Sequence, residues 1–235
     1  MEGCVGVDGA KSGWIAVWPE GEGFSWHVYD SAHALLDRHR GARVIAVDIP
    51  IGLSDREGRQ ADSQARRFVG GRRACSIFST PVRGILDAMS RAEASRRHKE
   101  IDGRGFGAQS FAILPKIRQW DELLQADAQA RQVVREIHPE VCFAALNGGP
   151  GHGLVESKRT PAGMEQRIAL LAAVFGREQV MALVQAVPRR EAATDDVLDA
   201  LAALWSAGRI SRGCAGTLPT PVVPDAVGLP AAIWY

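Results

Sequence analysis

The chain has 235 residues, a hydrophobic content of 46% and a formal net charge of +1. This length allows one sizeable core, and the near-neutral charge argues against a protein that coats nucleic acid through a global basic field. The scattered cysteines form no C-x-x-C pair, so neither a disulfide framework nor a structural zinc is expected. No apolar run could span a bilayer and no signal-peptide pattern is present. We therefore expect a single cytoplasmic domain over residues 1–235, without a membrane partner.

Residues 4–18 contain two short apolar runs around a Gly-containing turn, which is the pattern of a β-hairpin. Asp8 is expected to end the first strand. Burying its carboxylate beside Val5 and Val7 is costly unless a partner, a metal or water takes the charge. Asp8 and Gly9 could equally form the turn itself, because Asp-Gly is a common hairpin dipeptide. Both interpretations stay open on this segment alone.

The next residues predict a mixed α/β fold. Residues 24–29 are expected to form a third strand, and Ser31 is expected to cap a helix. Residues 43–50 form a continuous apolar run that ends at Asp48, as in a central strand buried on both faces. A helix between two strands normally makes a parallel crossover. We therefore predict a mixed β-sheet flanked by helices.

Residues 54–110 depart from this pattern, and we predict a basic helical and loop insertion after the fourth strand. Between Asp55 and Arg104, twelve Lys or Arg stand against seven Asp or Glu. A solvated helical face would explain this excess, and so would a surface that faces phosphate. Residues 72–81 are expected to be an extended loop whose side chains could donate to an anion.

The second half of the chain predicts helices around one more strand. Helices are expected at residues 116–124, 141–146, 161–175 and 178–187, and residues 133–137 should form a fifth strand with Glu136 near its end. From Thr194 to about Arg209, apolar residues recur at helical spacing, with Thr194 or Asp195 as the N-cap. Asp196 and Asp199 are three residues apart, so they share one face of this helix.

The acids at these element ends form a candidate metal site. Ligands collect outside the carboxyl ends of parallel strands, so Asp8, Asp48 and the two helix acids could converge there. Glu136 or Glu140 is a possible fifth member. Carboxylates that lie close together repel each other and are best tolerated beside hard divalent cations. Mg²⁺ or Mn²⁺ is the expected metal, and two such ions about 4 Å apart would support phosphodiester hydrolysis.

This pattern resembles the ribonuclease-H-like superfamily, particularly its Holliday-junction-resolvase branch. More closely, almost the whole chain resembles the domain of unknown function 429 family, described as predicted nucleases of that fold. The combination of motifs in one order carries this resemblance. The matching segments are residues 5–9, 47–53, 61–66, 72–81, 136–140, 157–167 and 195–200.

The resemblance implies a metal-dependent nuclease that hydrolyses DNA or RNA by a two-metal-ion mechanism. Asp8 would bridge both metals, Asp48 would hold one, and Asp196 and Asp199 would supply the helix ligands. Glu136 is the further candidate catalytic group. Asp48 stands where the resolvases usually carry Glu, so the metal spacing would differ.

Four basic residues are candidates for contacts to substrate phosphate: Arg66, Arg72, Arg73 and Lys158. Two other functions stay open at this point. One is a noncatalytic nucleic-acid- or partner-binding protein that retains the fold. The other is an ATP-binding protein of the actin and sugar-kinase type, although its second Asp-x-Gly hairpin is not found downstream. The Pro-rich tail, residues 213–235, could close a sheet edge or join a homodimer.

Overall fold

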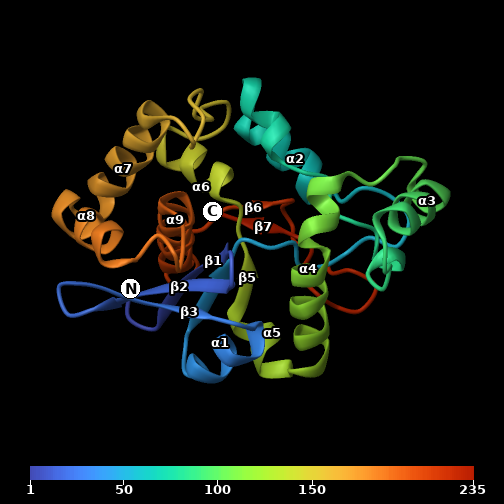
Figure 1. The fold of residues 1–235 in the computed structure, drawn as a ribbon, viewed down its shortest axis with the longest axis horizontal. Coiled ribbons are helices and arrows are strands. Elements are labelled where there is room, and N and C mark those ends of the chain that lie inside the picture. Colours follow the sequence, from blue (N-terminus) through green and yellow to red (C-terminus); the bar gives the residue numbers. More distant parts are fainter.

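A five-stranded sheet lies at the centre of the protein, in the order β3-β2-β1-β4-β5 (Figure 1). The computed structural model describes residues 1–235 apart from the side chain of Arg72, so the predicted phosphate contact of Arg72 lies outside the described part. The strands are β1 (Cys4–Ala10), β2 (Gly13–Glu20), β3 (Gly23–Tyr29), β4 (Val44–Val47) and β5 (Val134–Glu136). The first three strands pair antiparallel, whereas β4 and β5 run parallel to β1. The prediction of a mixed α/β sheet is confirmed.

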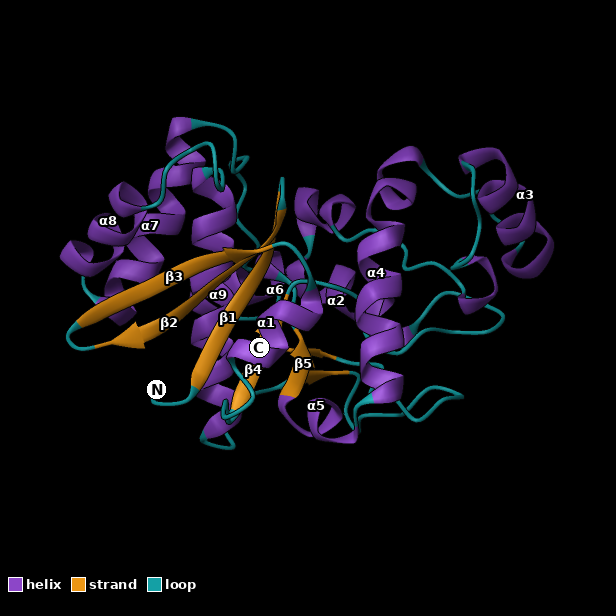
Figure 2. Ribbon diagram, turned by 60° about the horizontal axis from the view of Figure 1, so that its bottom comes forward, coloured by secondary structure: helices purple, strands orange, loops and turns teal.

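Helices cover both faces of this sheet (Figure 2). Successive side chains on a strand point to opposite faces, so Val5 and Val7 pack on one side of β1 and Cys4 packs on the other. The face of Val5 and Val7 is covered by α1 (Ala32–Arg38), α4 (Ala108–Ala126) and α5 (Ala128–Val133). The opposite face is covered by α6 (Pro139–Leu146), α7 (Pro161–Phe175), α8 (Arg177–Ala186) and α9 (Thr194–Ser211).

Helix α9 lies directly against β1, and Gly6 permits this close approach. A Cβ atom added at Gly6 would lie 2.2 Å from the backbone oxygen of Ala200 and 2.2 Å from the backbone nitrogen of Leu204. The apolar face of α9 is rich in alanine and fully buried in this region. Small residues on both elements therefore set how close the helix comes to the strand.

Residues 54–107 lie outside the sheet, and residues 91–102 form the end of the molecule away from α7 and α8 (Figure 1). Their elements are α2 (Gln60–Val69), two 3₁₀ turns, η1 (Gly71–Ser76) and η2 (Arg83–Ile85), and α3 (Arg91–Asp102). The expected extended loop at residues 72–81 is wrong in its first half. Gly70 and Gly71 have positive φ angles of 66° and 51°, which turn the chain sharply after α2 into η1.

Three boundaries also differ from the sequence prediction. Helix α4 begins at Ala108, ahead of the predicted residue 116, and carries Pro115 inside it. Helix α9 is capped by Ala193, whose N–H donates to the Asp196 carboxylate at 3.1 Å, so Thr194 and Asp195 are not the cap. Strand β5 is shorter than predicted. No described helix combines the length and the apolar character that crossing a membrane requires.

The C-terminal tail lies at the β5 edge of the sheet. It forms a two-stranded pair, β6 (Thr217–Leu218) and β7 (Ile233–Trp234), and Trp234 makes a parallel bridge to Ile137 just after β5. Of the two roles expected for the tail, this contact corresponds to the first: the tail covers an edge of the sheet.

The close contact between α9 and β1 gives a direct test of the fold. We expect Gly6→Ala to lower the free energy of unfolding by about 3 kcal/mol, because the new methyl group meets helix backbone that cannot move independently. Urea denaturation measures this change. Gly23→Ala is the matched control, since its added Cβ would have no neighbour within 4 Å, and it should change stability by less than about 1 kcal/mol. Equal effects of the two substitutions would contradict this account of the packing.

Candidate functional site

Asp8 and Asp48 lie next to each other on the face of the sheet that α9 covers. Strands β1 and β4 pair in parallel with Gly6 opposite Ala46, and the Asp48 N–H donates to the Val7 carbonyl at 3.0 Å. Asp8 follows Gly6 by two positions and Asp48 follows Ala46 by two, so both acids share the face of these small residues. The two carboxyl groups lie close enough that the negative charge of Asp48 raises the pKa of Asp8.

This arrangement decides between the two interpretations of Asp8. Asp8 pairs with Ile15 inside the ladder between β1 and β2, and Ala10 pairs with Gly13. The hairpin turn is therefore made by Lys11 and Ser12, and the reading of Asp8 and Gly9 as the turn is wrong. The strand continues for two residues beyond the acid, so the expectation that Asp8 ends the strand is wrong. Asp8 is buried, with only 7% of its surface exposed.

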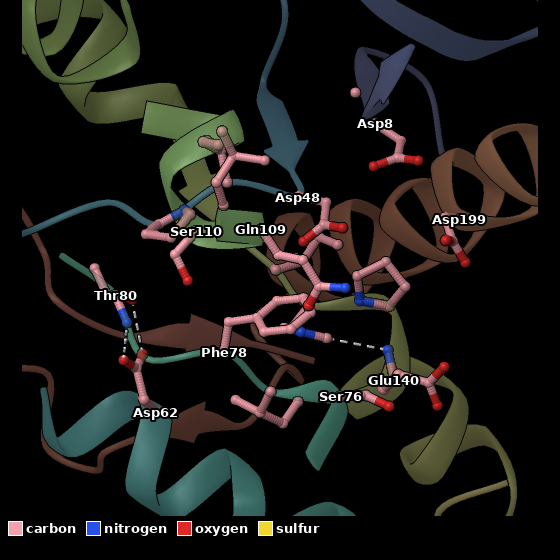
Figure 3. Close-up of a pocket in the computed structure, with 18 of the residues that line it drawn as sticks. Asp8, Asp48, Asp62, Ser76, Phe78, Thr80, Gln109, Ser110, Glu140 and Asp199 are labelled. Atoms are coloured by element: carbon pink, nitrogen blue, oxygen red, sulfur yellow. Dashed lines mark hydrogen bonds between the residues drawn. The ribbon is translucent and has the colours of Figure 1, made fainter. Parts of the chain in front are cut away.

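Asp199 joins these two acids from α9. It precedes Ala200, the residue whose carbonyl lies against Gly6, and it is 2% exposed. Figure 3 shows the carboxylates of Asp8, Asp48 and Asp199 arranged around one space, although they come from within β1, from just after β4 and from α9. The structure thus brings together three of the four predicted metal ligands.

Burial is the largest cause of an elevated pKa at each of these three acids. It raises the pKa of Asp8 well above its usual value, that of Asp48 to about 7 and that of Asp199 to about 6. The negative charges of the neighbours add to this effect, with Asp48 acting on Asp8 and Asp199 acting on Asp48. Protonation of these carboxylates, or a positive charge bound beside them, therefore stabilises the site.

Lys158, in the loop before α7, places one positive charge among these acids. Its Nζ lies 2.7 Å from Asp199 Oδ2 and 3.3 Å from Asp195 Oδ2. This pairing lowers the pKa of Asp199 against the effect of burial. The second oxygen, Asp199 Oδ1, is buried and accepts no hydrogen bond from the described residues. Buried polar atoms normally have a hydrogen-bond partner, and a bound ion or water molecule would provide one for Asp199 Oδ1.

Asp196, the fourth predicted ligand, lies at the rim. Its carboxylate accepts the hydrogen bond from the Ala193 N–H and so caps its own helix. The side chain also lines the pocket that contains Asp8, Asp48 and Asp199. Partial burial raises its pKa above the usual value. Asp196 thus combines a capping contact with a place beside Asp8, Asp48 and Asp199.

Glu136 lies on the opposite face of the sheet from Asp8 and Asp48. It pairs with Val47, which packs on the α4 face, and strand alternation fixes its direction. Arg59 Nη2 lies 2.7 Å from one of its oxygens, and the Ile51 N–H donates to the other at 2.7 Å. These contacts join α2 to the end of the sheet. A catalytic role for Glu136 stays a prediction.

The predicted phosphate contacts Arg66 and Arg73 donate to other parts of the chain. Arg66 donates to the Ile77 carbonyl at 3.0 Å and to Ser79 Oγ at 2.9 Å. Arg73 donates to the Leu154 carbonyl at 2.7 Å. Arg73 also lines the pocket. Their contacts order the segment after η1 and fasten it to the loop before Lys158.

Glu140 was an open candidate for a fifth acid, and the structure places it in the pocket wall. Arg167 lies 2.6 Å from one of its oxygens, while Glu140 Oε2 is buried without a hydrogen bond from the described residues. His138 caps α6, its Nδ1 accepting from the Glu140 N–H at 3.2 Å. Burial lowers the pKa of His138 to about 4, so its ring is neutral near pH 7.

Sequence reasoning did not single out Arg59 or Lys116. Arg59 stands three residues before Asp62, a spacing typical of an ion pair at the start of a helix. This spacing is the sequence signal that could have identified Arg59. Lys116 donates to the carbonyls of Ala10 and Gly13, each at 2.8 Å. It thereby holds the β1–β2 turn against α4, and no local pattern announces such a distant contact.

The acids form one end of a pocket of about 700 Å³. Its other walls come from residues 75–81 and from the first turns of α4, as the labelled side chains in Figure 3 show. Arg159 and Lys158 line the side of the loop before α7. The pocket is thus acidic where the strands end and of mixed character on the side of residues 75–81.

The donor atoms of this pocket suit a hard cation. Asp8, Asp48 and Asp199 offer only oxygen ligands, as Mg²⁺ and Mn²⁺ prefer, and Asp199 Oδ1 is an orphaned acceptor. Within the described residues, no group of three or more His, Cys, Asp or Glu side chains is already arranged to hold a metal. A cation bound here would therefore have to draw the carboxylates closer together.

The fold and the site define an α/β protein with a mixed, helix-flanked sheet and buried acids at its strand ends, compatible with a ribonuclease-H-like fold. Residues 6–223 match the family described as "Protein of unknown function (DUF429)". Because this match covers most of the sequence, the chain belongs to the DUF429 family. No curated protein and no solved structure matched it.

The elevated pKa of Asp48 predicts how stability depends on pH without metal. A pKa of about 7 in the folded chain, against about 4 when unfolded, means that the native state binds the proton more tightly. The contribution of Asp48 to stability therefore falls as pH rises from about 4 to about 7. We expect Asp48→Asn to stabilise the metal-free protein by about 1–3 kcal/mol at about pH 8 and to change little at about pH 4.

Thermal denaturation in EDTA at both pH values measures this difference. The exposed acid Asp30 provides the control, and Asp30→Asn should show no such pH dependence. A destabilising effect of Asp48→Asn at about pH 8 would refute the elevated pKa.

Proposed function

We propose that this protein is a metal-dependent hydrolase of phosphodiester bonds in nucleic acid, built on a ribonuclease-H-like fold. The observation that carries the proposal is the convergence of three carboxylates, those of the buried Asp8 and Asp199 and of the half-buried Asp48, with Lys158 paired directly to Asp199. Such a cluster is costly for folding and useful for holding divalent cations. The mixed sheet and the flanking helices support the same class.

Asp8, Asp48 and Asp199 would hold Mg²⁺ or Mn²⁺, with Asp196 available at the rim. Bound in pairs, such ions activate a water molecule and stabilise the leaving oxygen of a phosphodiester. Asp8 is the natural shared ligand, because the charges of both Asp48 and Asp199 act on it. Lys116, from α4, holds the backbone of the turn that follows Asp8. These contacts keep the acid in position.

Lys158 would have two states in this proposal. In the metal-free chain its ammonium group pairs with Asp199. A divalent cation on Asp199 would compete with that pair and release Lys158 toward a phosphate oxygen, the contact predicted from the sequence. The lysine side chain is about one third exposed, so it can turn toward a substrate without unfolding its surroundings.

A noncatalytic nucleic-acid-binding protein with this fold is the second candidate. The pairing of Lys158 with Asp199 favours it, because this ion pair already supplies part of the positive charge that the acids need. In that case the pocket would bind its ligand through Arg73, Arg159 and Lys158 without cutting it.

Metal binding and cleavage together test the proposed function. We expect wild-type protein to bind Mn²⁺ in calorimetry and to cut DNA or RNA oligonucleotides only with Mg²⁺ or Mn²⁺. Asp8→Asn and Asp199→Asn should each weaken cleavage roughly 100-fold or more, because each removes a charged oxygen ligand. Asp30→Asn should leave both measurements unchanged.

The outcomes separate the candidates. Cutting that survives Asp8→Asn would reveal a contaminating nuclease and sink the assignment. Oligonucleotide binding without metal binding or cleavage would favour the noncatalytic protein.

A further inference from the structure

Phe78 lies in the pocket wall with its aromatic ring uncovered. The residue is 48% exposed, whereas its neighbour Ile77 is 3% exposed and Thr80 is 6% exposed. Of the exposed large apolar side chains in the described part of the chain, only Phe78 lines the pocket that contains the acids. A single exposed apolar residue on a convex surface needs no explanation, but one that faces a polar pocket points to a ligand.

The backbone on both sides of Phe78 is held firmly by α2. Before it, the Ile77 carbonyl accepts a hydrogen bond from Arg66 at 3.0 Å. After it, the Thr80 N–H and hydroxyl both donate to the Asp62 carboxylate, at 2.7 and 3.1 Å (Figure 3). Ile77 packs into the core around α2. The ring is therefore presented from a fixed segment, as a binding wall requires.

Polar side chains lie beside the ring at the start of α4. Figure 3 shows Gln109 and Ser110 on the same side of the pocket as Phe78, across from Asp8 and Asp199. The described residues give neither side chain a hydrogen-bond partner, so their amide and hydroxyl groups can bond to a ligand. An aromatic face next to free donors and acceptors is typical of a site for a nucleobase.

The size of the pocket limits what can enter it. Pockets of about 300–1,000 Å³ hold ligands of drug size. The volume of about 700 Å³ therefore admits one or two nucleotides of a strand, whereas a base-paired duplex does not fit inside it. A base that enters must be unpaired, in a single strand or flipped out of a helix.

We infer that Phe78 is the stacking platform for an unpaired nucleobase of the substrate strand, and that Gln109 and Ser110 contact the edge of that base. The inference rests on the proposed function, because it places the phosphate of the same strand at the acidic end of the pocket. It names the substrate class: the protein acts on single-stranded or locally unpaired nucleic acid. Stacking on a ring accepts every base, so little sequence preference is expected.

Binding of oligonucleotides tests this inference separately from cleavage. Fluorescence anisotropy is measured at fixed salt with labelled oligothymidylate and oligouridylate of about 12 nucleotides and with a blunt duplex of the same length. Ca²⁺ replaces Mg²⁺, and gels verify that the probes stay intact. We expect at least one single strand to bind roughly 10-fold or more tightly than the duplex.

Substitutions that remove the aromatic ring of Phe78 should weaken this binding, and a substitution that keeps an aromatic ring should not. Phe78→Ala should weaken it roughly 10- to 100-fold, Phe78→Leu should weaken it nearly as much, and Phe78→Trp should retain it. Met89→Ala removes an apolar side chain that is 84% exposed and lies outside the pocket, so it should have no effect. Circular dichroism verifies that each variant is folded.

Several results would overturn the inference. These are duplex binding as tight as single-strand binding, binding that is unchanged in Phe78→Ala, and failure of both single strands to bind. Displacement of the oligonucleotide by thymidine monophosphate at an equal concentration would assign the pocket to a free nucleotide and also overturn it. Phe78-dependent binding without cleavage would support the stacking role and remove the hydrolase proposal. Metal-dependent cleavage together with binding that does not depend on Phe78 would support the hydrolase proposal and overturn the stacking role.

Discussion

The contact between α9 and β1 at Gly6 is the constraint on which the rest of the structure depends. Because Gly6 lacks a side chain, the backbone of α9 lies on the backbone of β1, with Ala200 against the strand. Asp199 precedes that contact on the helix, and Asp8 follows Gly6 by two positions on the same face of the strand. This close packing of α9 on β1 thus also brings two acids together, and the parallel register of β4 adds Asp48.

The grouping of these acids has an electrostatic cost that the rest of the fold offsets only in part. Lys158 pairs with Asp199, yet burial still raises the pKa of Asp199, Asp48 and Asp8. Mutual repulsion in a low-dielectric site would be relieved by cations or by protons. A site that lowers the stability of the metal-free chain is expected where function needs charge in a place that folding does not favour.

The basic residues of the segment outside the sheet mostly serve contacts within the protein. Arg59 bridges Glu136 at the end of β5 and Asp62 on α2, and Asp62 in turn holds Thr80. This buried network connects the end of the sheet to the segment that carries Phe78. Breaking a buried pair leaves an uncompensated charge, so separating these segments is costly in free energy. The network therefore favours one arrangement of the acidic end of the pocket and its aromatic wall.

The sequence by itself determined the alternation of elements and which acids lie near the carboxyl ends of β1 and β4, because apolar periodicity is a local pattern. It could not place Glu136, because the face of the sheet to which Glu136 points depends on its register with Val47. It also could not identify the hydrogen-bond partners of Arg66 and Arg73. The partner of Arg66 lies in an irregular segment, and that of Arg73 lies far along the chain. Nor did it show that Phe78 faces the acids, since the turn after α2 sets that direction. Pairing register and long-range packing decided these features, and both arise only when distant segments meet.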